Sequence, residues 1–551
     1  MWCIGPDRAD LWTTEHRRTL NPPAMRSTIL VAAASLQLAA HAQLTNGCFT
    51  IGGPEYELAR AVVQTTDGGY AFAGLTISYN TTNVPQSMYV VKTDANGAVQ
   101  WNTSYEHPLF TSIGVATDMI QTTDGGYAVA GVSTQSSMGL VKLDATGTVQ
   151  WSKQYDTAAD LFDDVNAMVQ TPDGGYLLAA LAVNGKMVLI KTDAVGEIEW
   201  SKAYDSGFGT GTPYDVVVAL GGGYAVCGHQ SNTSQGLHVL RVDENGDVLW
   251  GKRYGMDIDL AHAIAATPDS GFVVAGFTYS YGFAVYGQEQ DAFVVKIDQG
   301  GGLEWARAFG DTMLSEIFYG VVPTSDGGYA MAGEVTHISG IGVPRFFVAK
   351  CDANGERLWS QKLNGANQRG VAYDIIECTD GGLAVTGLMN IPTNNAQCAF
   401  MKMEADGTIC PACGPEPYGR DSTAVFIPED ITYTVSDGVA TSADYTAVVV
   451  QGGVVEGDCL ETGIAEGTST ANVITIAPNP AMDQCSVSLG NATDIEGLEV
   501  LSSQGVLITY IPVNGRTQVV LPVARLAQGV YVIRAIGSAR PQQVRLVVMD
   551  R

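Results

Sequence analysis

The stretch QTTDGGYAFAG, from Gln64 to Gly74, returns almost unchanged as QTTDGGYAVAG, from Gln121 to Gly131. The same acidic, glycine-rich phrase can be followed along the chain at intervals of 48 to 57 residues. Self-similarity at such a period is typical of a repeat architecture, in which each unit buries its apolar face against the next one. The phrase ends in an aromatic residue or a leucine at Tyr70, Tyr127, Tyr176, Tyr224, Phe272, Tyr329 and Leu383.

A second phrase comes after each of the first six copies and ends in tryptophan. VKTDANGAVQW, which ends at Trp101, is the first example. Six of the eight tryptophans in the chain occupy this position, so we expect a large ring in the same packed slot of each unit. These are Trp101, Trp151, Trp200, Trp250, Trp305 and Trp359.

The two phrases predict four strands in each unit. RAVVQT and YAFAG flank one turn, at Asp67-Gly68-Gly69, while YVVKTD and AVQWNTSY flank another, at Ala95-Asn96-Gly97. The flanks carry the β-branched and aromatic residues of strands, and glycine supplies the positive φ of a tight hairpin. A neighbouring Asp or Asn can hydrogen-bond the turn backbone. Four short strands in seven units predict an all-β, seven-bladed β-propeller with a tryptophan wedged between adjacent sheets.

The seventh unit is incomplete. Pro411 stands where the tryptophan is expected, and no fourth strand comes after it. CFTIGGPEYELA, which starts at Cys48, resembles the segment after the tryptophan in other units, so the N-terminal strand is predicted to complete the last sheet and to hide its edge. Cys48 would then come near Cys410, which suggests a disulfide that closes the ring.

The Asp, Gly and Trp of the second phrase are similar to the tryptophan-docking repeat of quinoprotein-type propellers, although the turn is one residue shorter here. This resemblance covers the repeat skeleton alone. The adjacent cysteine pair that the quinone-dependent dehydrogenases of that family use has no counterpart in this sequence, so no cofactor is expected.

The N-terminus has the pattern of a signal peptide. Arg26 supplies the positive charge, Ile29 to Ala40 the apolar stretch, and Ala40-His41-Ala42 the small-residue cleavage site. We expect residues 1–42 to be a leader, with cleavage near Ala42, a natural start at Met25 and an exported product. The apolar stretch is shorter than the about 20 residues of a membrane span, and no other stretch is long enough.

The composition excludes some classes of partner. The formal net charge of −28 argues against binding to nucleic acid or to an anionic membrane surface, because both need a basic face.

After the predicted ring of residues 43–412, the composition shifts to Ser, Thr, Val, Gly and acids over residues 413–472, which predicts a linker or a small β appendage. Residues 473–551 form a run of short strands separated by turn residues, which predicts a small β-sandwich.

This last segment resembles the type A C-terminal sorting domain of the Bacteroidota type IX secretion system. The resemblance implies passage through the Sec route, recognition by the type IX machinery at the outer membrane, and a product that is secreted or held at the cell surface. The alternative is an ordinary adhesive β-sandwich. The matching residues are Pro478-Asn479-Pro480, Ser503-Gln504-Gly505, Leu526, Gly529-Val530-Tyr531 and the closing QVRLVVMD. The whole layout, a glycine- and tyrosine-rich repeat ring before this domain, is similar to a common kind of secreted Bacteroidota protein.

Ten cysteines in an exported chain favour disulfides, and Cys3 lies in the leader. Cys410 and Cys413 form CPAC, but a metal site would need a second such pair or histidines at ligand spacing. Disulfides or buried thiols are therefore preferred to a metal. Cys413 and Cys459 bracket the predicted linker and could also pair.

Binding residues are expected on the face opposite the short turns, where the connections vary in length. Aromatic residues gather in TISYNTTNVPQS and FTYSYGFAVYGQEQ, and a histidine lies in VTHISGIGVPR. They could stack on sugar rings or bind a peptide, or they could pack under their own loops. The candidates are Tyr79, Tyr279, Tyr281, Phe283, Tyr286 and His337.

Asp118, Asp215 and Asp374 share one repeat position, nine residues before the motif aromatic. We place them at the start of the innermost strand, where they could ring the channel mouth and hold a cation, or simply hydrogen-bond nearby turns. No catalytic signature such as GxSxG or HExxH occurs. The sequence thus favours an exported binding protein, with a secreted polysaccharide hydrolase whose acids lie on the variable loops, or a structural surface component, as alternatives.

Overall fold

The computed structural model describes most of the chain between residues 46 and 548, and the elements in these ranges are β-strands. The described ranges are 46–79, 86–106, 114–133, 137–157, 164–182, 185–207, 210–231, 236–255, 258–279, 290–312, 314–337, 343–363, 369–390, 396–410, 415–424, 426, 429–432, 434–437, 440–444, 448–451, 475–477, 484–489, 497–502, 507–513, 515–523, 526, 529–536 and 542–548. No helix in these ranges is long and apolar enough to cross a membrane.

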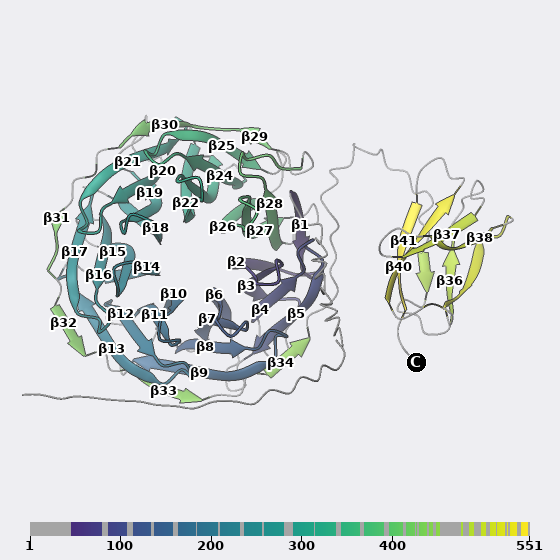
Figure 1. The fold of residues 1–551 in the computed structure, drawn as a ribbon, viewed down its shortest axis with the longest axis horizontal. Coiled ribbons are helices and arrows are strands. Elements are labelled where there is room, and N and C mark those ends of the chain that lie inside the picture. Colours follow the sequence, from purple (N-terminus) through teal and green to yellow (C-terminus); the bar gives the residue numbers. More distant parts are fainter. Residues whose placement is uncertain are drawn as a thin grey trace, which may run out of the picture.

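Each repeat forms an antiparallel four-stranded meander, and the meanders succeed one another around a ring (Figure 1). The first strand of each meander lies nearest the centre and the fourth lies at the rim. Such antiparallel sheets are consistent with a β-propeller. Sheets 1 to 3 are β2 (Glu57–Gln64), β3 (Tyr70–Thr76), β4 (Ser87–Thr93) and β5 (Val99–Glu106); β6 (Val115–Gln121), β7 (Tyr127–Ser133), β8 (Ser137–Leu143) and β9 (Val149–Thr157); and β10 (Asp164–Gln170), β11 (Tyr176–Leu181), β12 (Met187–Thr192) and β13 (Ile198–Asp205).

The next meanders continue the pattern. Sheets 4 to 6 are β14 (Thr210–Val218), β15 (Tyr224–Ser231), β16 (Leu237–Val242) and β17 (Val248–Tyr254); β18 (Asp259–Ala266), β19 (Phe272–Thr278), β20 (Asp291–Ile297) and β21 (Leu303–Gly310); and β22 (Leu314–Pro323), β23 (Tyr329–His337), β24 (Arg345–Cys351) and β25 (Arg357–Leu363).

The N-terminal strand completes the last sheet of the ring, as the sequence predicts. Sheet 7 contains β26 (Gly370–Glu377), β27 (Leu383–Asn390) and β28 (Ala396–Met403), and β1 (Gly47–Ile51) pairs antiparallel with β28. Phe400 of β28 packs on Tyr70 of sheet 1, with ring centroids 4.8 Å apart. The first and last repeats therefore share a hydrophobic core in the same way as successive repeats do.

The predicted disulfide between Cys48 and Cys410 is wrong. Cys410 has a free thiol, whereas Cys48 is buried and disulfide-bonded to another cysteine. Cys413 and Cys459, the other two candidates, lie outside the described residues.

Residues 416–451 do not form the predicted linker or separate appendage. They make six short strands, which we call the belt, and each adds a fifth strand to the rim of one sheet (Figure 1). The belt visits sheets 6, 5, 4, 3, 2 and 1 in that order, against the order of the repeats. Its strands are β29 (Glu416–Pro417), β30 (Arg420–Thr423), β31 (Glu429–Asp430), β32 (Thr434–Asp437), β33 (Ala440–Asp444) and β34 (Val448–Gln451).

The belt has a regular step. In each of sheets 1 to 6, the residue two positions after the tryptophan pairs with one belt residue. These belt residues follow one another along the chain at a spacing of six residues for the first step and seven for each later step. One such step spans the gap between neighbouring rims, and each belt strand covers backbone groups that an outer strand would otherwise expose. The paired positions are Pro417, Thr423, Asp430, Asp437, Asp444 and Gln451.

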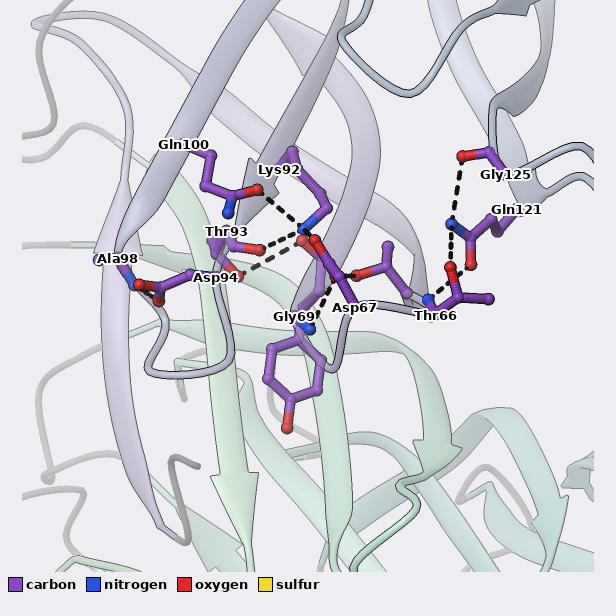
Figure 2. A network of polar contacts seen from close by, with 12 residues as sticks. Thr66, Asp67, Gly69, Lys92, Thr93, Asp94, Ala98, Gln100, Gln121 and Gly125 are labelled. Carbon is purple, nitrogen blue, oxygen red and sulfur yellow. Dashed lines mark hydrogen bonds and ion pairs between the residues drawn. The ribbon is translucent and has the colours of Figure 1, made fainter. Parts of the chain in front are cut away.

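The acidic phrase is a hairpin turn held by an ion pair (Figure 2). The Asp67 carboxylate accepts a hydrogen bond from the backbone N–H of Gly69 at 3.0 Å and lies 2.9 Å from the ammonium of Lys92 on β4. Lys92 is buried and also donates to the carbonyl of Thr93. The turn therefore fixes the hairpin of β2 and β3 and also joins it to the next strand. The equivalent ion pairs are Asp124–Lys142, Asp173–Lys191, Asp269–Lys296, Asp326–Lys350 and Asp380–Lys402.

Sheet 4 lacks this ion pair because Gly221 stands in place of the aspartate. Its cation is an arginine, Arg241, whose guanidinium donates instead to the backbone carbonyls of Gly222, Tyr224 and Val242. The buried cation thus finds an acceptor in each of these sheets.

The tryptophans are wedges between adjacent sheets, as predicted. The ring of Trp101 packs edge-on against Tyr127 of sheet 2, with centroids 5.9 Å apart, and lies against Gly147. Four residues further on, the Tyr105 hydroxyl donates to the carbonyl of the same Gly147 at 2.6 Å. A side chain at Gly147 would collide with the indole, so the glycine of the second phrase serves the next sheet as well as its own turn.

The C-terminal segment forms two small sheets around one hydrophobic core that includes Val487, Val500 and Ile533. One sheet contains β35 (Thr475–Ala477), β36 (Gln484–Ser488) and β39 (Gln518–Pro522); the other contains β38 (Leu507–Pro512), β37 (Gly497–Ser502), β40 (Gly529–Ile536) and β41 (Gln542–Val548).

Candidate ligand-binding centre

A β-bulge interrupts the innermost strand of every sheet in the ring at the same place. In sheet 1, Ala59 and Ala61 both keep their pairing with β3, and Arg60 between them is the extra residue. Bulges bend a strand and re-aim a side chain, and they are frequent beside functional sites. The glycine that ends the repeated phrase lies opposite, where a Cβ on Gly74 would come within 1.9 Å of the Leu58 carbonyl oxygen.

The bulge residues differ from sheet to sheet although they share one repeat position, ten residues before the motif aromatic. Arg60 is exposed and the others are half-buried. They are Arg60, Thr117, Asn166, Tyr214, His262, Tyr319 and Tyr373.

Five of these side chains touch one another in a continuous arc that crosses sheets 4, 5, 6, 7 and 1. The Tyr214 and His262 rings are 4.8 Å apart, those of His262 and Tyr319 5.0 Å, and those of Tyr319 and Tyr373 5.6 Å, centroid to centroid. The Arg60 guanidinium then lies over the Tyr373 ring at 5.7 Å. We call these five residues the arc. Sheets 2 and 3 carry only Thr117 and Asn166, so the centre is chemically asymmetric.

Polar groups surround the Tyr373 end of the arc. The Tyr319 hydroxyl donates a hydrogen bond to Glu334 at 3.2 Å. Arg369, which is exposed just before β26, acts electrostatically on both Tyr373 and Glu334. Arg369 and Arg60 both act electrostatically on Tyr56 as well. Tyr56 precedes β2 and Arg369 precedes β26, so both belong to connections between sheets.

The titratable groups of the arc are mostly neutral near pH 7. Burial lowers the pKa of His262 to about 4, so its imidazole is uncharged. Burial also raises the pKa of the Glu334 carboxyl and holds that of the Tyr319 phenol well above its usual value. The arc therefore offers ring faces and neutral hydrogen-bonding groups, with a guanidinium at one end.

Asp118, Asp215 and Asp374 lie beside the bulges, in the middle of their strands and not at the start as predicted from the sequence. Each carboxylate accepts two backbone N–H groups, one from its own strand and one from the next sheet. Asp215, for example, accepts from Val216 at 2.7 Å and from Ile264 at 2.8 Å. The inter-sheet bonds from Met168 and Val62 reach Asp118 and Asp374 at 2.7 and 2.8 Å.

These bonds join sheets and do not involve turns. Burial raises the pKa of Asp118 to about 6 and that of Asp215 and Asp374 to about 7, although the N–H donors oppose the shift. In the described ranges no cluster of three or more His, Cys, Asp or Glu side chains is arranged to hold a metal ion. The carboxylates act as cross-links between neighbouring innermost strands.

The predicted loop aromatics are only partly within the described residues. Tyr79 donates its hydroxyl to the Gly52 carbonyl at 2.9 Å and packs on Tyr89, and Tyr279 accepts a hydrogen bond from Gln290 and meets Phe277 edge-on. Both are half-buried, and most of the connection that follows each of them lies outside the described residues. Tyr281, Phe283 and Tyr286 lie outside the described residues, as does the side chain of His337 at the end of β23.

The arc is absent from the sequence-based predictions, although its signal is present in the chain. Those predictions rest on the positions that repeat and on the position nine residues before the motif aromatic, where only three aspartates occur. The position ten residues before the motif aromatic holds an arginine, a histidine and three tyrosines in five of the repeats. The core-facing neighbours of these residues on the same strands are small or aliphatic. A search for unlike residues at equivalent positions would have found them.

The C-terminal sheets include the described part of the predicted sorting motif. Gly529 begins β40, and Tyr531 pairs with Ser502 and Leu546 and packs against the segment's core. Pro478, Asn479, Pro480 and Gly505 lie outside the described residues. Residues 475–549 match the family model of the secretion system C-terminal sorting domain. This sorting domain indicates export directed by the type IX secretion system, to the cell surface or the medium.

The chain has remote likeness to several solved structures. A Dyadobacter fermentans protein of unknown function is 12% identical, with a TM-score of 0.38, over 65% of this chain and 98% of that one. The NanB sialidase of Streptococcus pneumoniae is 9% identical, with a TM-score of 0.37, over 65% and 71%. A putative exo-β-1,3-galactanase of Bifidobacterium bifidum is 12% identical, with a TM-score of 0.30, over 47% and 96%. Similarity at this level carries no argument about chemistry, and no curated protein matches the sequence.

Proposed function

We propose that the protein is an exported, seven-bladed β-propeller that binds a ligand at the centre of its ring and is delivered by its sorting domain. The observation that carries the proposal is the arc, because it joins unlike side chains from five sheets into one partly exposed surface on a scaffold that is otherwise repeated. Clustered aromatic faces with neutral polar tips suit the apolar faces and hydroxyls of a glycan. A peptide is the other ligand that such a surface could take.

The same proposal covers the layout of the chain. Residues 1–42 are a leader that is removed near Ala42, the ring with its belt extends to about residue 451, and residues 473–551 form a small sandwich. The product then acts outside the cell, either released or held at the outer-membrane surface. The sorting domain match supports the export route, and the belt supports a ring that ends later than residue 412.

A secreted hydrolase that acts on polysaccharide is the second candidate. The observation that favours it is the Tyr319–Glu334 hydrogen bond, since a phenol beside a carboxyl group could transfer a proton or attack a bound sugar. The raised pKa of Tyr319 disfavours the phenolate that such an attack needs. Binding without turnover is therefore preferred.

The test is a screen of the full chain against glycans, glycosides and peptides, with binding and bond cleavage scored on the same panel. We expect binding without cleavage, and we expect Tyr214→Ala and Tyr319→Ala to weaken it. Tyr510→Ala is the matched control, because that tyrosine is exposed on β38 in the C-terminal segment.

Each other outcome counts against the proposal. Cleavage that Glu334→Gln abolishes would establish the hydrolase. Binding that all three tyrosine variants retain would move the site away from the arc. Silence across the panel would favour a structural role at the surface.

A further inference from the structure

Arg60 and Arg369 are two exposed cations at one end of the arc. Neither side chain has an ion pair or hydrogen bond with the described residues, although acids outnumber Lys and Arg by 57 to 29 in the chain. Arginines elsewhere on the ring do pair. Arg307 lies 2.5 Å from Glu356, Arg345 3.2 Å from Glu416, and Arg357 3.2 Å from Asp421. Arg369 acts electrostatically on Glu334, but among the described residues neither Arg60 nor Arg369 has a carboxylate at ion-pair distance, so both are open to an anion from outside.

The two guanidinium groups act on the same pair of tyrosines. Both act electrostatically on Tyr56 and on Tyr373, and Arg60 also lies over the Tyr373 ring. They come from different sheets, because Arg60 is the bulge residue of β2 in sheet 1 and Arg369 immediately precedes β26 in sheet 7. The seam between the first and last repeats thus places two cations beside two half-buried phenol rings.

The acids near this seam do not cancel the two cations. Glu334 is engaged by the Tyr319 hydroxyl, and the Asp374 carboxyl is turned into the sheet interface, where Val62 and Ile375 donate to it. Burial raises the pKa of Asp374 to about 7, which reduces its negative charge near neutral pH, and burial also raises the pKa of Glu334. The field at the exposed end of the arc is therefore more positive than the net charge of the chain suggests.

A planar guanidinium forms two parallel hydrogen bonds with a carboxylate, and a tyrosine face packs on the C–H face of a sugar ring. We propose that the arc takes an acidic glycan, with the carboxylate of a uronate-type sugar between Arg60 and Arg369 and its ring against Tyr373. The rest of the arc, Tyr319, His262 and Tyr214, continues away from the charge and provides room for neutral sugars. This inference rests on the proposed binding function and specifies the class of its ligand.

The experiment measures the affinity of the full chain for three probes of similar length at low salt. The probes are an oligogalacturonate, a dextran sulfate fraction and a neutral galacto-oligosaccharide. We expect the oligogalacturonate to bind most tightly and its affinity to fall as salt is added. Arg60→Gln and Arg369→Gln should each weaken this binding at least about tenfold, since a charge-assisted hydrogen bond is lost.

The matched control is Arg420→Gln, which removes the same charge from an exposed position on β30 of the belt and should leave the affinity unchanged. Because the side chains of Arg60 and Arg369 are exposed, their variants should keep the wild-type unfolding midpoint, which checks that they fold. Tyr373→Leu should weaken the binding of charged and neutral probes alike.

Three results would overturn the proposal, and they differ in whether they also refute the proposed binding function. Equal binding of the neutral probe, lost in Tyr373→Leu but not in Arg60→Gln, would leave the binding function intact and refute the acidic ligand. Preference for dextran sulfate over the oligogalacturonate would replace the carboxylate by a sulfate. Binding of none of the probes would refute the acidic glycan, and a silent glycan and peptide screen would remove the binding function as well.

Discussion

The ring contains two sets of aspartates that differ in how often they recur, in their bonding partners and in their pKa values. The turn acids, such as Asp326, recur in six of the repeats, are partly exposed, and pair with a buried lysine. The inner-strand acids, Asp118, Asp215 and Asp374, occur in only three repeats and accept backbone N–H groups across a sheet interface. The pKa of the turn acid Asp326 is lowered, whereas that of the inner-strand acid Asp215 is raised. Regular recurrence therefore marks an acid that builds the repeat, whereas irregular occurrence marks a local adjustment at the centre.

The largest effect is expected from the loss of a turn acid. Asp326→Asn removes the partner of the Lys350 ammonium, which lies 2.6 Å from it and is 4% exposed. A buried cation without its carboxylate is costly, and because Asp326 itself is half exposed we expect a loss of about 2 kcal/mol in the free energy of unfolding. Urea denaturation of the full chain measures it.

Asp352→Asn is the control for that experiment, because Asp352 accepts only the turn N–H groups of Asn354 and Glu356. A loss as large in the control as in Asp326→Asn would mean that turn geometry, and not the buried lysine, accounts for the recurrent form of the repeat.

We expect Asp215→Asn to lower the free energy of unfolding by a smaller amount, about 1 kcal/mol at pH 5. The reason is that one acceptor for the Val216 and Ile264 N–H groups is lost. The folded pKa of Asp215 is raised to about 7, so the folded protein binds this proton more tightly than the unfolded chain does. Its contribution to stability is complete below the unfolded pKa near 4 and is lost as the pH rises through 7. The difference between wild type and variant should therefore shrink between pH 5 and pH 8.

The contribution of the turn acids to stability changes with pH in the opposite direction. The pKa of Asp326 is lowered to about 2, so its contribution is present above pH 4 and disappears as the pH falls towards 2. Unfolding curves recorded from pH 2.5 to pH 8 separate the two sets. A wild-type free energy of unfolding that rises steadily with pH across this whole range would contradict the division.

The smallest effect is expected from transplanting a turn acid into sheet 4. Gly221→Asp with Arg241→Lys recreates the missing ion pair, and the new Cβ would meet only the flexible end of Gln299. Since the guanidinium of Arg241 already donates hydrogen bonds to backbone carbonyls, we expect the free energy of unfolding to rise by less than about 1 kcal/mol. Either single variant should be less stable than the pair. A double-mutant cycle with no coupling would show that position 221 does not need the acid.

The sequence predicts the features that recur. The hairpin turns, the tryptophan wedges and the closing strand β1 (Gly47–Ile51) all arise from residues that recur at equivalent positions in the repeats, and the structure contains them. Even the lysine of the turn ion pair was visible, since Lys92 and its equivalents recur and only the repeat without the aspartate has Arg241. That pairing could have been inferred without coordinates.

The belt and the arc could not be inferred in the same way. Belt strands such as Glu416–Pro417 and Glu429–Asp430 are too short to carry an alternating pattern, and their partners lie far away in the chain. The arc depends on ring contacts between Tyr214, His262, Tyr319 and Tyr373, which arise only when four sheets meet at one axis. Residues that differ from repeat to repeat have no periodicity for a sequence pattern to reveal.

The reversed path of the belt has a consequence for how the molecule is made. Residues 416–451 leave the ribosome after all the sheets that they cover, and they cover the rims from sheet 6 back to sheet 1. A chain that stops before residue 451 therefore has at least one rim bare, and the rim that waits longest belongs to the sheet made first. Full coverage of these rims is therefore a physical record that synthesis has gone past the ring, a short distance before the sorting domain at residues 475–549.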